Sequence, residues 1–549
     1  MRITCNGKTI DFLGGTTAKE ALRALGAYTP DVLAAVHRGQ AVDLLSALTG
    51  DGNIRPLTLR DEEGRRVYER SLRFVMLLAI RQLFPGQRVR IEYSVGNGVY
   101  IRLPGRELSA QDVADIETRM RRLTEENLRF EIRTWSRDDA IRYFEQDGQP
   151  DKVALLKTRP YDWFNMYRCG GMWEYFYGAM TQGTGDVKVF ALHPVPPDGF
   201  ALCLPTAAHP DTPVDFIERP KHMAVFNQSA KWCEILGVSN ISDITRKRDE
   251  QDLRRFIQVN ETLHDLAMGA IAKEIADGNK RVVLVAGPSS SGKTTFAGRL
   301  TVQLEVLGLK AMRVSIDDYY IDRDQVPLEP DGTLDLERPD ILDLDRMQSD
   351  LNRLMAGEEV ELPRFNFATG HREAEGVPAR LRENEIIVVE GIHALNPMLS
   401  DRLPREAVHR VFVSALTCLN LDDHNRIRTT DVRLLRRIVR DYLFRGTKPT
   451  ETLAMWESVR RGEETWIFPF QENADSMFNT ALHYELPVLR HYAYDLLQAV
   501  PPEAEGGLMA RRLMKMLHYV PDVDEEILRE IPSTSLLREF IGGSTVEGD

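Results

Sequence analysis

The sequence lacks any apolar run near the roughly 20 residues that a membrane-spanning helix needs. It also lacks an apolar signal segment at its start, because residues 1–7 lead into the alternating pattern of a strand. We therefore expect a cytoplasmic protein with no membrane partner.

Cysteine is scarce, and no CxxC pair is present to hold zinc or to begin a disulfide framework. The odd number and wide spacing of the thiols predict that all of them are reduced. The five cysteines are Cys5, Cys169, Cys203, Cys233 and Cys418.

An excess of positive charge is absent too. The chain has 70 Lys and Arg against 83 Asp and Glu, for a net charge of −13. Because nucleic-acid binding draws on clustered cations, this balance argues against a nucleic acid as the main partner. A local basic groove stays compatible with it.

The chain has 549 residues, no internal repeat and no low-complexity tract. At roughly 150 residues per domain, three or four units are expected. Strand and helix patterns predict a small α+β domain over residues 1–62, a mixed α+β domain over 63–240 and a connecting helix within 241–280. Alternating strands and helices over 281–500 indicate an α/β domain with a parallel sheet, and residues 501–549 a helical tail after a flexible link.

Three local patterns predict the bounds of two helices and the position of one turn. Apolar residues recur at helical spacing from Val67 to Leu83 and again from Gln251 to Ala276. Asn97-Gly98, between the alternating stretches 91–93 and 99–101, predicts a hairpin turn.

The strongest motif begins after the buried-type strand Arg281–Ala286, where residues 287–295 read GPSSSGKTT and fit GxxxxGK[ST]. Glycines let such a loop curl until its backbone N–H groups point at phosphates, ahead of a helix predicted over 296–307. Lys293 would reach the β and γ oxygens, and the Thr294 hydroxyl would ligate Mg²⁺. The cofactors predicted are thus ATP and Mg²⁺, with the ATP contacts Gly287, Ser289, Ser290, Ser291, Gly292, Lys293, Thr294 and Thr295.

Two carboxylates follow predicted strands of the same sheet. Asp317 comes after the strand 311–316, and Glu390 after the strand 386–389. The carboxyl ends of parallel strands face the ligand crevice of an open α/β sheet. We assign Asp317 as the base that takes a proton from an attacking hydroxyl, and Glu390 as a magnesium-side ligand.

A run of arginines lies in the helical segment 431–446. Arg433, Arg436, Arg437 and Arg440 share one face at helical spacing. Stacked guanidinium groups repel one another and seek an anion, which a migrating phosphoryl group supplies.

Taken together, four segments resemble the uridine kinase and phosphoribulokinase family: residues 287–295, Val314–Tyr320, Glu390-Gly391-Ile392 and Arg436–Asp441. The resemblance covers about residues 281–490. It implies a catalytic base at Asp317, magnesium support at Glu390 and a ribose contact near Glu337. The lid arginines Arg437 and Arg440 would act in catalysis with Lys293, and Arg445, just beyond them, would contact ATP.

The acceptor side of the resemblance matches less well. The family's P-x-Y-D-F stretch reads Pro363–Phe367 here without the tyrosine, its following histidine aligns with Gly370, and the second Arg of its RGR is Thr447. The acceptor contacts assigned on this resemblance, beside Asp317, Glu337 and Arg437, are Tyr320, Phe365, Phe367, His371 and Arg372.

The N-terminal part resembles threonyl-tRNA synthetase. Residues 1 to about 62 are similar to its β-grasp TGS domain, and residues 68–85 to the start of its editing domain. Where that domain has an HxxxH pair, this chain has Arg70 and Phe74, and its later C-x-G-x-H element reads Cys169–Trp173 without the histidine. Lacking those imidazoles, the region is interpreted as a retired editing fold used for binding, regulation or packing.

The function expected from these features is transfer of the γ-phosphate of ATP to a small acceptor, with a nucleoside 5′-hydroxyl as the preferred candidate. One alternative is a sugar phosphate, as in phosphoribulokinase. Another is a nucleotide-gated RNA- or tRNA-binding regulator, because TGS domains also accompany GTPases, although no NKxD element follows Thr295. A homo-oligomer and a tRNA-related role of the N-terminal half stay open.

Overall fold

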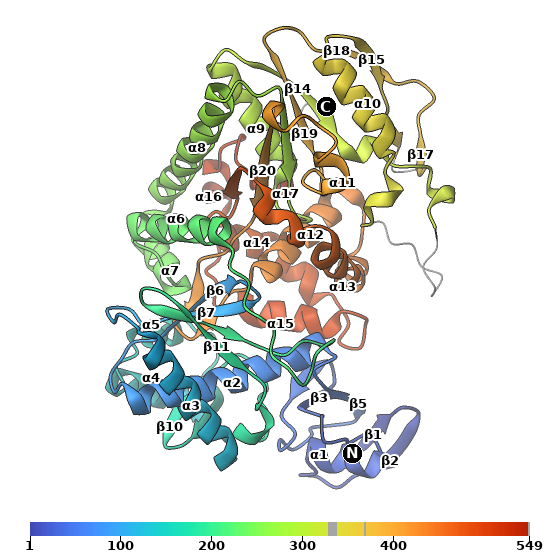
Figure 1. Cartoon of the computed structure of the whole chain (residues 1–549). Helices are drawn as coiled ribbons and strands as arrows, with labels where there is room; N and C mark the ends of the chain where they lie inside the picture. Colours follow the sequence, from blue (N-terminus) through green and yellow to red (C-terminus); the bar gives the residue numbers. More distant parts are fainter. Residues whose placement is uncertain (328–336, 367–368, 547–549) are drawn as a thin grey trace.

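The computed structural model describes residues 1–327, 337–366 and 369–546. In Figure 1 the N-terminal sheet lies at the lower right, a second group of strands and helices at the lower left, and a parallel sheet in the upper half. In these described parts, every helix is too short or too polar to cross a bilayer.

The first 57 residues form a five-stranded sheet with one helix packed on it, in the strand order β2-β1-β5-β3-β4. β1 and β5 pair in parallel, and the remaining pairs are antiparallel. Thr17 and Glu20 cap the helix reciprocally, which fixes where it begins. This is the β-grasp arrangement that the sequence predicted. The elements are β1 (Arg2–Cys5), β2 (Lys8–Asp11), α1 (Ala18–Leu25), β3 (Ala34–His37), β4 (Gln40–Val42) and β5 (Gly52–Leu57).

The next region combines a buried helix with two antiparallel sheets, ordered β11-β12-β7-β6 and β10-β9-β8. Its central helix is α2 (Glu62–Leu83), which ends at Leu83 as predicted but begins five residues before Val67. The other elements are β6 (Arg90–Val95), β7 (Gly98–Arg102), α3 (Ala110–Glu126), β8 (Glu131–Ser136), α4 (Arg137–Gln146), α5 (Pro150–Lys157), β9 (Trp163–Cys169), β10 (Met172–Glu174), β11 (Ala191–Val195) and β12 (Gly199–Cys203).

The predicted hairpin joins β6 to β7, but its turn lies one residue earlier than expected. Val95 pairs with Gly98, so Gly96 and Asn97 are the central residues. Both have positive φ, 51° and 71°. A tight hairpin needs this left-handed backbone at both central positions, which glycine and asparagine adopt readily.

Three helices lead to the parallel sheet: α6 (Pro220–Leu236), α7 (Ile241–Asp249) and α8 (Leu253–Asp277). The periodicity of 251–276 located α8 within two residues at each end. Met268, Ala272 and Ile275 of α8 are buried against the sheet and α9 (Lys293–Val306). The helix therefore covers a sheet face in addition to connecting two regions.

The upper sheet has five strands in the order β14-β19-β13-β20-β23, and every pairing is parallel. Strands buried on both faces read as continuous apolar runs, which is why the sequence revealed them. Their bounds are β13 (Val282–Ala286), β14 (Lys310–Ser315), β19 (Glu385–Glu390), β20 (Val408–Ser414) and β23 (Ser476–Asn479).

Further helices and short strand pairs surround this sheet. The helices are α10 (Leu344–Met355), α11 (Pro397–Ser400), α12 (Thr429–Arg445), α13 (Pro449–Trp466) and α14 (Glu485–Gln498). The antiparallel pairs are β15 (Glu359–Leu362) with β18 (Val377–Arg380), β16 (Phe365–Asn366) with β17 (His371–Arg372), and β21 (Asn420–Asp422) with β22 (Asn425–Arg426).

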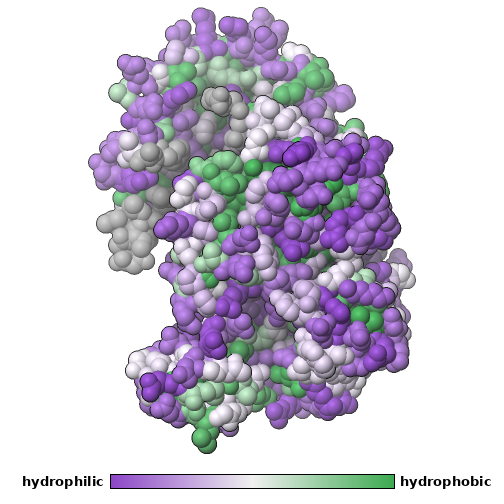
Figure 2. Space-filling model, turned by 180° about the vertical axis from the view of Figure 1, so that it is seen from behind, coloured by the Kyte–Doolittle hydropathy of each residue, from purple (hydrophilic) through white to green (hydrophobic). Residues whose placement is uncertain are grey.

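The C-terminal segment is packed against the rest of the chain. It contains α15 (Gly507–Leu517), α16 (Glu525–Glu530) and α17 (Arg538–Ile541). α15 packs on α14 and touches β4 of the N-terminal sheet, whereas α17 packs on α12. Leu513, Leu536 and Phe540 are fully buried. Seen from behind, the surface is largely hydrophilic and is hollowed between the N-terminal five-stranded sheet and the rest of the chain (Figure 2).

Candidate active site

The loop between β13 and α9, here called the phosphate loop (Gly287–Gly292), curls as its glycines predict. Ser290 and Gly292 have φ of 56° and 86°. A Cβ at Gly287 would lie 2.0 Å from the carbonyl oxygen of Val413, so only glycine fits there. The Thr480 hydroxyl donates to the Ser291 carbonyl at 2.5 Å and fixes the far side of the loop.

Three predicted residues lie together at the carboxyl edge of the sheet. β19 lies between β13 and β14, and Glu390 is in register with both Val285 and Ser315. Asp317 follows in the short 3₁₀ helix η2 (Ile316–Tyr319). Lys293, at the start of α9, interacts electrostatically with Glu390 and Asp317.

The electrostatics of this group follow from its burial. Desolvation raises the pKa of Asp317, and the Lys293 ammonium opposes that rise. Desolvation together with the Asp317 charge raises the pKa of Glu390 to about 7. Burial lowers the pKa of Lys293, while the two carboxylates favour its charged form. When both carboxyls are ionised they outnumber the single ammonium, so a bound cation would favour their ionised forms.

These residues fit the cofactors that the motif predicts. Thr294 and Glu390 offer oxygen ligands, which Mg²⁺ requires. The buried hydroxyls of Ser290 and Ser291 have no hydrogen-bond partner within the part of the chain that the structure describes. A second acidic group, Asp322 with Asp324 and His371, brings its ligand atoms within 4.8 Å of one another on the surface. Nothing in the sequence had pointed to that group.

Two glutamates that sequence reasoning missed contact the phosphate loop and the first turn of α9. The Ser289 N–H donates to Glu463 at 2.9 Å, and the Thr295 N–H donates to Glu539 at 3.3 Å. Glu463 lies on α13 and Glu539 on α17, 174 and 244 residues further along the chain. No local motif marks them, because only folding brings them to the loop.

The arginines of α12 divide into two kinds, which corrects the prediction of one anion-seeking face. Arg433 and Arg436 are buried and ion-paired with Glu463 and Glu485. Arg436 also donates to the Thr480 carbonyl at 2.9 Å. Their charges are therefore matched by partners within the protein.

The lid arginines Arg437, Arg440 and Arg445 have different partners. Arg437 donates to the Ser289 hydroxyl at 2.8 Å. Arg440 and Arg445 pair with Asp441 at 2.9 and 3.5 Å. Arg445 is about half exposed and acts electrostatically on Asp317.

The assigned acceptor residues surround η2. The rings of Tyr320 and Phe365 lie 5.7 Å apart, and Tyr320 is electrostatically coupled to Asp317 and Glu337. Arg372 donates to the Tyr320 carbonyl at 2.8 Å and to Asp343 at 2.9 Å. Its guanidinium therefore fixes the segment that follows η2. His371 lies 3.7 Å from Asp322 at the surface. Phe367 lies outside the described residues.

The residues that replace the synthetase histidines have other partners. Arg70 pairs with Glu63 at 2.7 Å, and Phe74 is buried with its ring 5.3 Å from that of Phe130. Cys169 is 2% exposed, and burial raises the pKa of its thiol to about 12. A thiol of this kind is inert, because the thiolate is the reactive form.

The sheet order, the phosphate loop and the strand-end carboxylates define a P-loop kinase domain. Residues 282–484 match the model of the Phosphoribulokinase / Uridine kinase family, so the predicted resemblance of this segment is confirmed. Among solved structures, one described as a candidate fructose transport system kinase from a Silicibacter species is 21% identical, with a TM-score of 0.29, and covers 38% of this chain and 98% of its own. One described as a candidate uridine kinase from Bacillus stearothermophilus is 19% identical, with a TM-score of 0.26, and covers 39% of this chain and 97% of its own.

The N-terminal region is similar to threonine–tRNA ligases, as predicted. The ligase of Carboxydothermus hydrogenoformans is 30% identical over 190 residues, 34% of this chain and 30% of the ligase. That of Gluconacetobacter diazotrophicus is 33% identical over 151 residues, 27% of this chain and 24% of the ligase. The chain thus spans less than a third of the length of these relatives.

We expect Arg436→Ala to destabilise the protein without any direct effect on phosphates. Removing the guanidinium leaves Glu485 buried and unpaired, which costs about 3–5 kcal/mol. Urea denaturation would measure the loss, with Arg461→Ala on the exposed face of α13 as the control. A loss below about 1 kcal/mol would contradict the structural role.

We expect Glu539→Gln to tighten ATP binding at least about threefold, because the carboxylate at the Thr295 amide repels a phosphate that approaches the same donor. Calorimetry with a non-hydrolysable ATP analogue would measure the Kd. Glu526→Gln, an exposed carboxylate on α16, is the matched control. An unchanged or weaker Kd for the Glu539 variant would show that Glu539 does not compete with nucleotide.

Proposed function

We propose that this protein is an ATP-dependent kinase that transfers the γ-phosphate to a nucleoside, with the 5′-hydroxyl as the nucleophile. The observation that carries the proposal is the meeting of Lys293, Asp317 and Glu390 beside the phosphate loop. The family match of residues 282–484 supports the kinase class. The choice of a nucleoside rests on the resemblance of the acceptor segments.

Asp317 is the base in this proposal. It follows β14 directly, and Tyr320 lies three residues on beside Phe365, where an acceptor ring would contact it. The raised pKa of a buried carboxyl makes it a better proton acceptor than a solvated one. It would take the hydroxyl proton as the oxygen attacks phosphorus.

Lys293 and Arg437 have the positioning and charge-stabilising roles. The backbone amides of the phosphate loop would hold the β-phosphate, and Lys293 would neutralise charge on the β and γ oxygens. Arg437 already contacts Ser289 of the loop, so a small rotation of its side chain would bring it to the transferring group. Arg440 and Arg445 would supply further positive charge as the Asp441 pairs rearrange.

Thr294 and Glu390 would hold Mg²⁺, which neutralises phosphate charge when bound. Desolvation and the Asp317 charge raise the pKa of Glu390 to about 7 although Lys293 opposes the rise, and a cation bound beside Glu390 would favour its ionised form. Asp317 follows β14 and lies in η2, which the assigned acceptor residues surround, so we assign it as the base.

Lys293→Ala is expected to abolish nucleotide-supported turnover, whereas Asp317→Asn should keep ATP binding and lower turnover at least roughly 10²-fold. A coupled assay of ADP release with each variant would test both. Cys169→Ala, far from the loop in sequence and buried in another core, is the control that should keep activity. A fully active Asp317→Asn enzyme would require a different base.

The acceptor would be decided by a panel of nucleosides and pentose phosphates with ATP. We expect ADP release to rise with a pyrimidine nucleoside. The missing tyrosine at Phe365 and the threonine at Thr447 favour the rival acceptor, a sugar phosphate. A rise with the sugar phosphate alone would reject the nucleoside. Turnover with neither acceptor, together with tight tRNA binding, would favour a nucleotide-gated regulator.

A further inference from the structure

Two adjoining cavities lie between the N-terminal regions and the kinase domain. The larger has a volume of about 540 Å³, within the range of small-molecule sites, and the smaller about 90 Å³. They share Tyr177, Arg512 and Lys515 in their walls. The β3–β4 turn, α2, α15 and the β22–α12 connection all contribute to the walls.

The walls of these cavities are strongly basic. Eight arginine and lysine side chains line them, against three carboxylates. One of those carboxylates, Glu69, is shared by Arg73, Arg426 and Arg428. A single carboxylate cannot neutralise three guanidinium groups, so positive charge is left over inside the protein.

Several donors in this cluster lack an acceptor. The Nε atoms of Arg70, Arg73 and Arg426 are buried with no hydrogen-bond partner among the described residues. The side chains of Arg73 and Arg426 are 7% and 8% exposed. Buried polar atoms are nearly always paired, so unpaired ones indicate a missing partner.

Burial and mutual repulsion lower the pKa of Arg73 and Arg428 well below the usual range, and that of Arg426 to about 10. Because guanidinium does not lose its proton in proteins, this repulsion persists until an anion relieves it.

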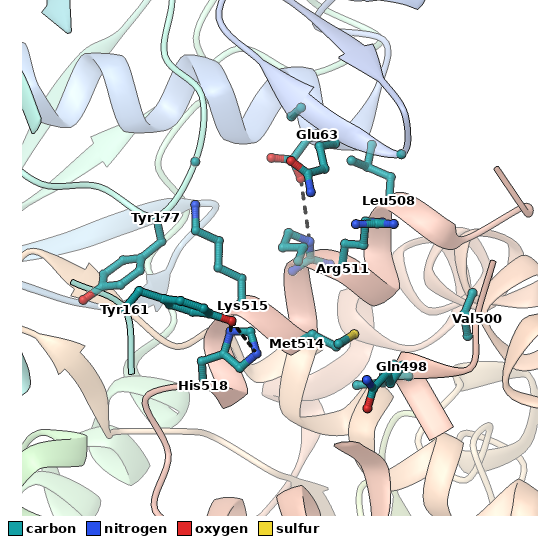
Figure 3. A pocket seen from close by; sticks show the side chains of 16 residues that line it. Glu63, Tyr161, Tyr177, Gln498, Val500, Leu508, Arg511, Met514, Lys515 and His518 are labelled. Carbon is teal, nitrogen blue, oxygen red and sulfur yellow. Dashed lines mark hydrogen bonds and ion pairs between the residues drawn. The ribbon is translucent and has the colours of Figure 1, made fainter. Parts of the chain in front are cut away.

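The larger cavity is lined by aromatic side chains and by the flexible cation Lys515. In Figure 3, Lys515 extends from α15 toward the space between Tyr177 and Glu63, and Tyr161 lies against His518. The Tyr161 and His518 rings are 5.3 Å apart, and half of Tyr161 is exposed. Lys515 has no acceptor among the described residues. Desolvation and the nearby Arg70 lower its pKa to about 8, which leaves it mostly charged at neutral pH.

We propose that the joined cavities bind a nucleoside phosphate, with its phosphates at the cluster of Arg73, Arg426 and Arg428 and its ring in the larger cavity beside Tyr161 and Tyr177. Guanidinium forks match phosphate geometry, and aromatic faces accept any base. This site lies apart from the phosphate loop and does not depend on the kinase reaction.

The test uses calorimetry on the full chain carrying Lys293→Ala, which weakens nucleotide binding at the phosphate loop. The probes are ADP, inorganic pyrophosphate and adenosine. We expect ADP to bind, pyrophosphate to bind more weakly because it lacks a ring, and adenosine to bind least. Adding Lys515→Ala should weaken ADP binding at least about tenfold, as expected for one lost charge-assisted contact.

Lys273→Ala, an exposed lysine on α8, is the matched control and should leave ADP binding unchanged. Arg428→Gln is the second variant, and it should weaken both ADP and pyrophosphate. The proposal is overturned if neither ADP nor pyrophosphate binds to the Lys293→Ala protein. It is also overturned if the Lys515→Ala and Arg428→Gln variants bind ADP as tightly as their parent. Pyrophosphate binding as tight as that of ADP would also overturn it, because the larger cavity would then contribute nothing.

Discussion

The rest of the functional architecture depends on how α12 is held at two places. In its first turn, Asp431 pairs with Arg66 of α2 and Arg512 of α15 at 3.0 and 2.6 Å. Two and six residues further on, Arg433 and Arg437 contact Ser289 of the phosphate loop. Six residues separate Asp431 from Arg437, about 9 Å along a helix. The N-terminal regions are thus connected to the loop by one rigid element.

The two places that hold α12 have opposite excesses of charge around them. The pKa of Asp431 is held far below its usual range, since Arg512 and Arg66 outweigh the cost of burying it. Around it the arginines of α2 and β22 remain in excess, and at the loop the excess is of carboxylates: Glu390, Asp317 and Glu539. A phosphate-bearing ligand suits the first place, and a metal with its nucleotide the second. At both places, buried side chains of one charge outnumber those of the opposite charge.

The N-terminal half packs other side chains at the positions where its resemblance to threonyl-tRNA synthetase would place histidines. Phe74 fills a core among Phe130 and Phe176, where a histidine would have required a hydrogen-bonding or metal partner. Arg70 is instead paired and contributes to a basic cavity shared with the kinase domain. The ligand site that we propose at this interface would give the region a role in binding, one of the three roles expected for it.

The sequence alone determined the β-grasp and parallel-sheet classes, the bounds of α8 and β13 within two residues, and the neighbourhood of Lys293, Asp317 and Glu390. These follow from local rules: apolar periodicity, glycine spacing, and the convergence of parallel strand ends. Only the tertiary structure decided that Arg433 and Arg436 are internally paired, and that Glu463 and Glu539 reach the loop. It alone assembled the basic cavity from α2, β22 and α15. Helical spacing tells which side chains share a face, whereas the partner of that face is set by packing between segments hundreds of residues apart.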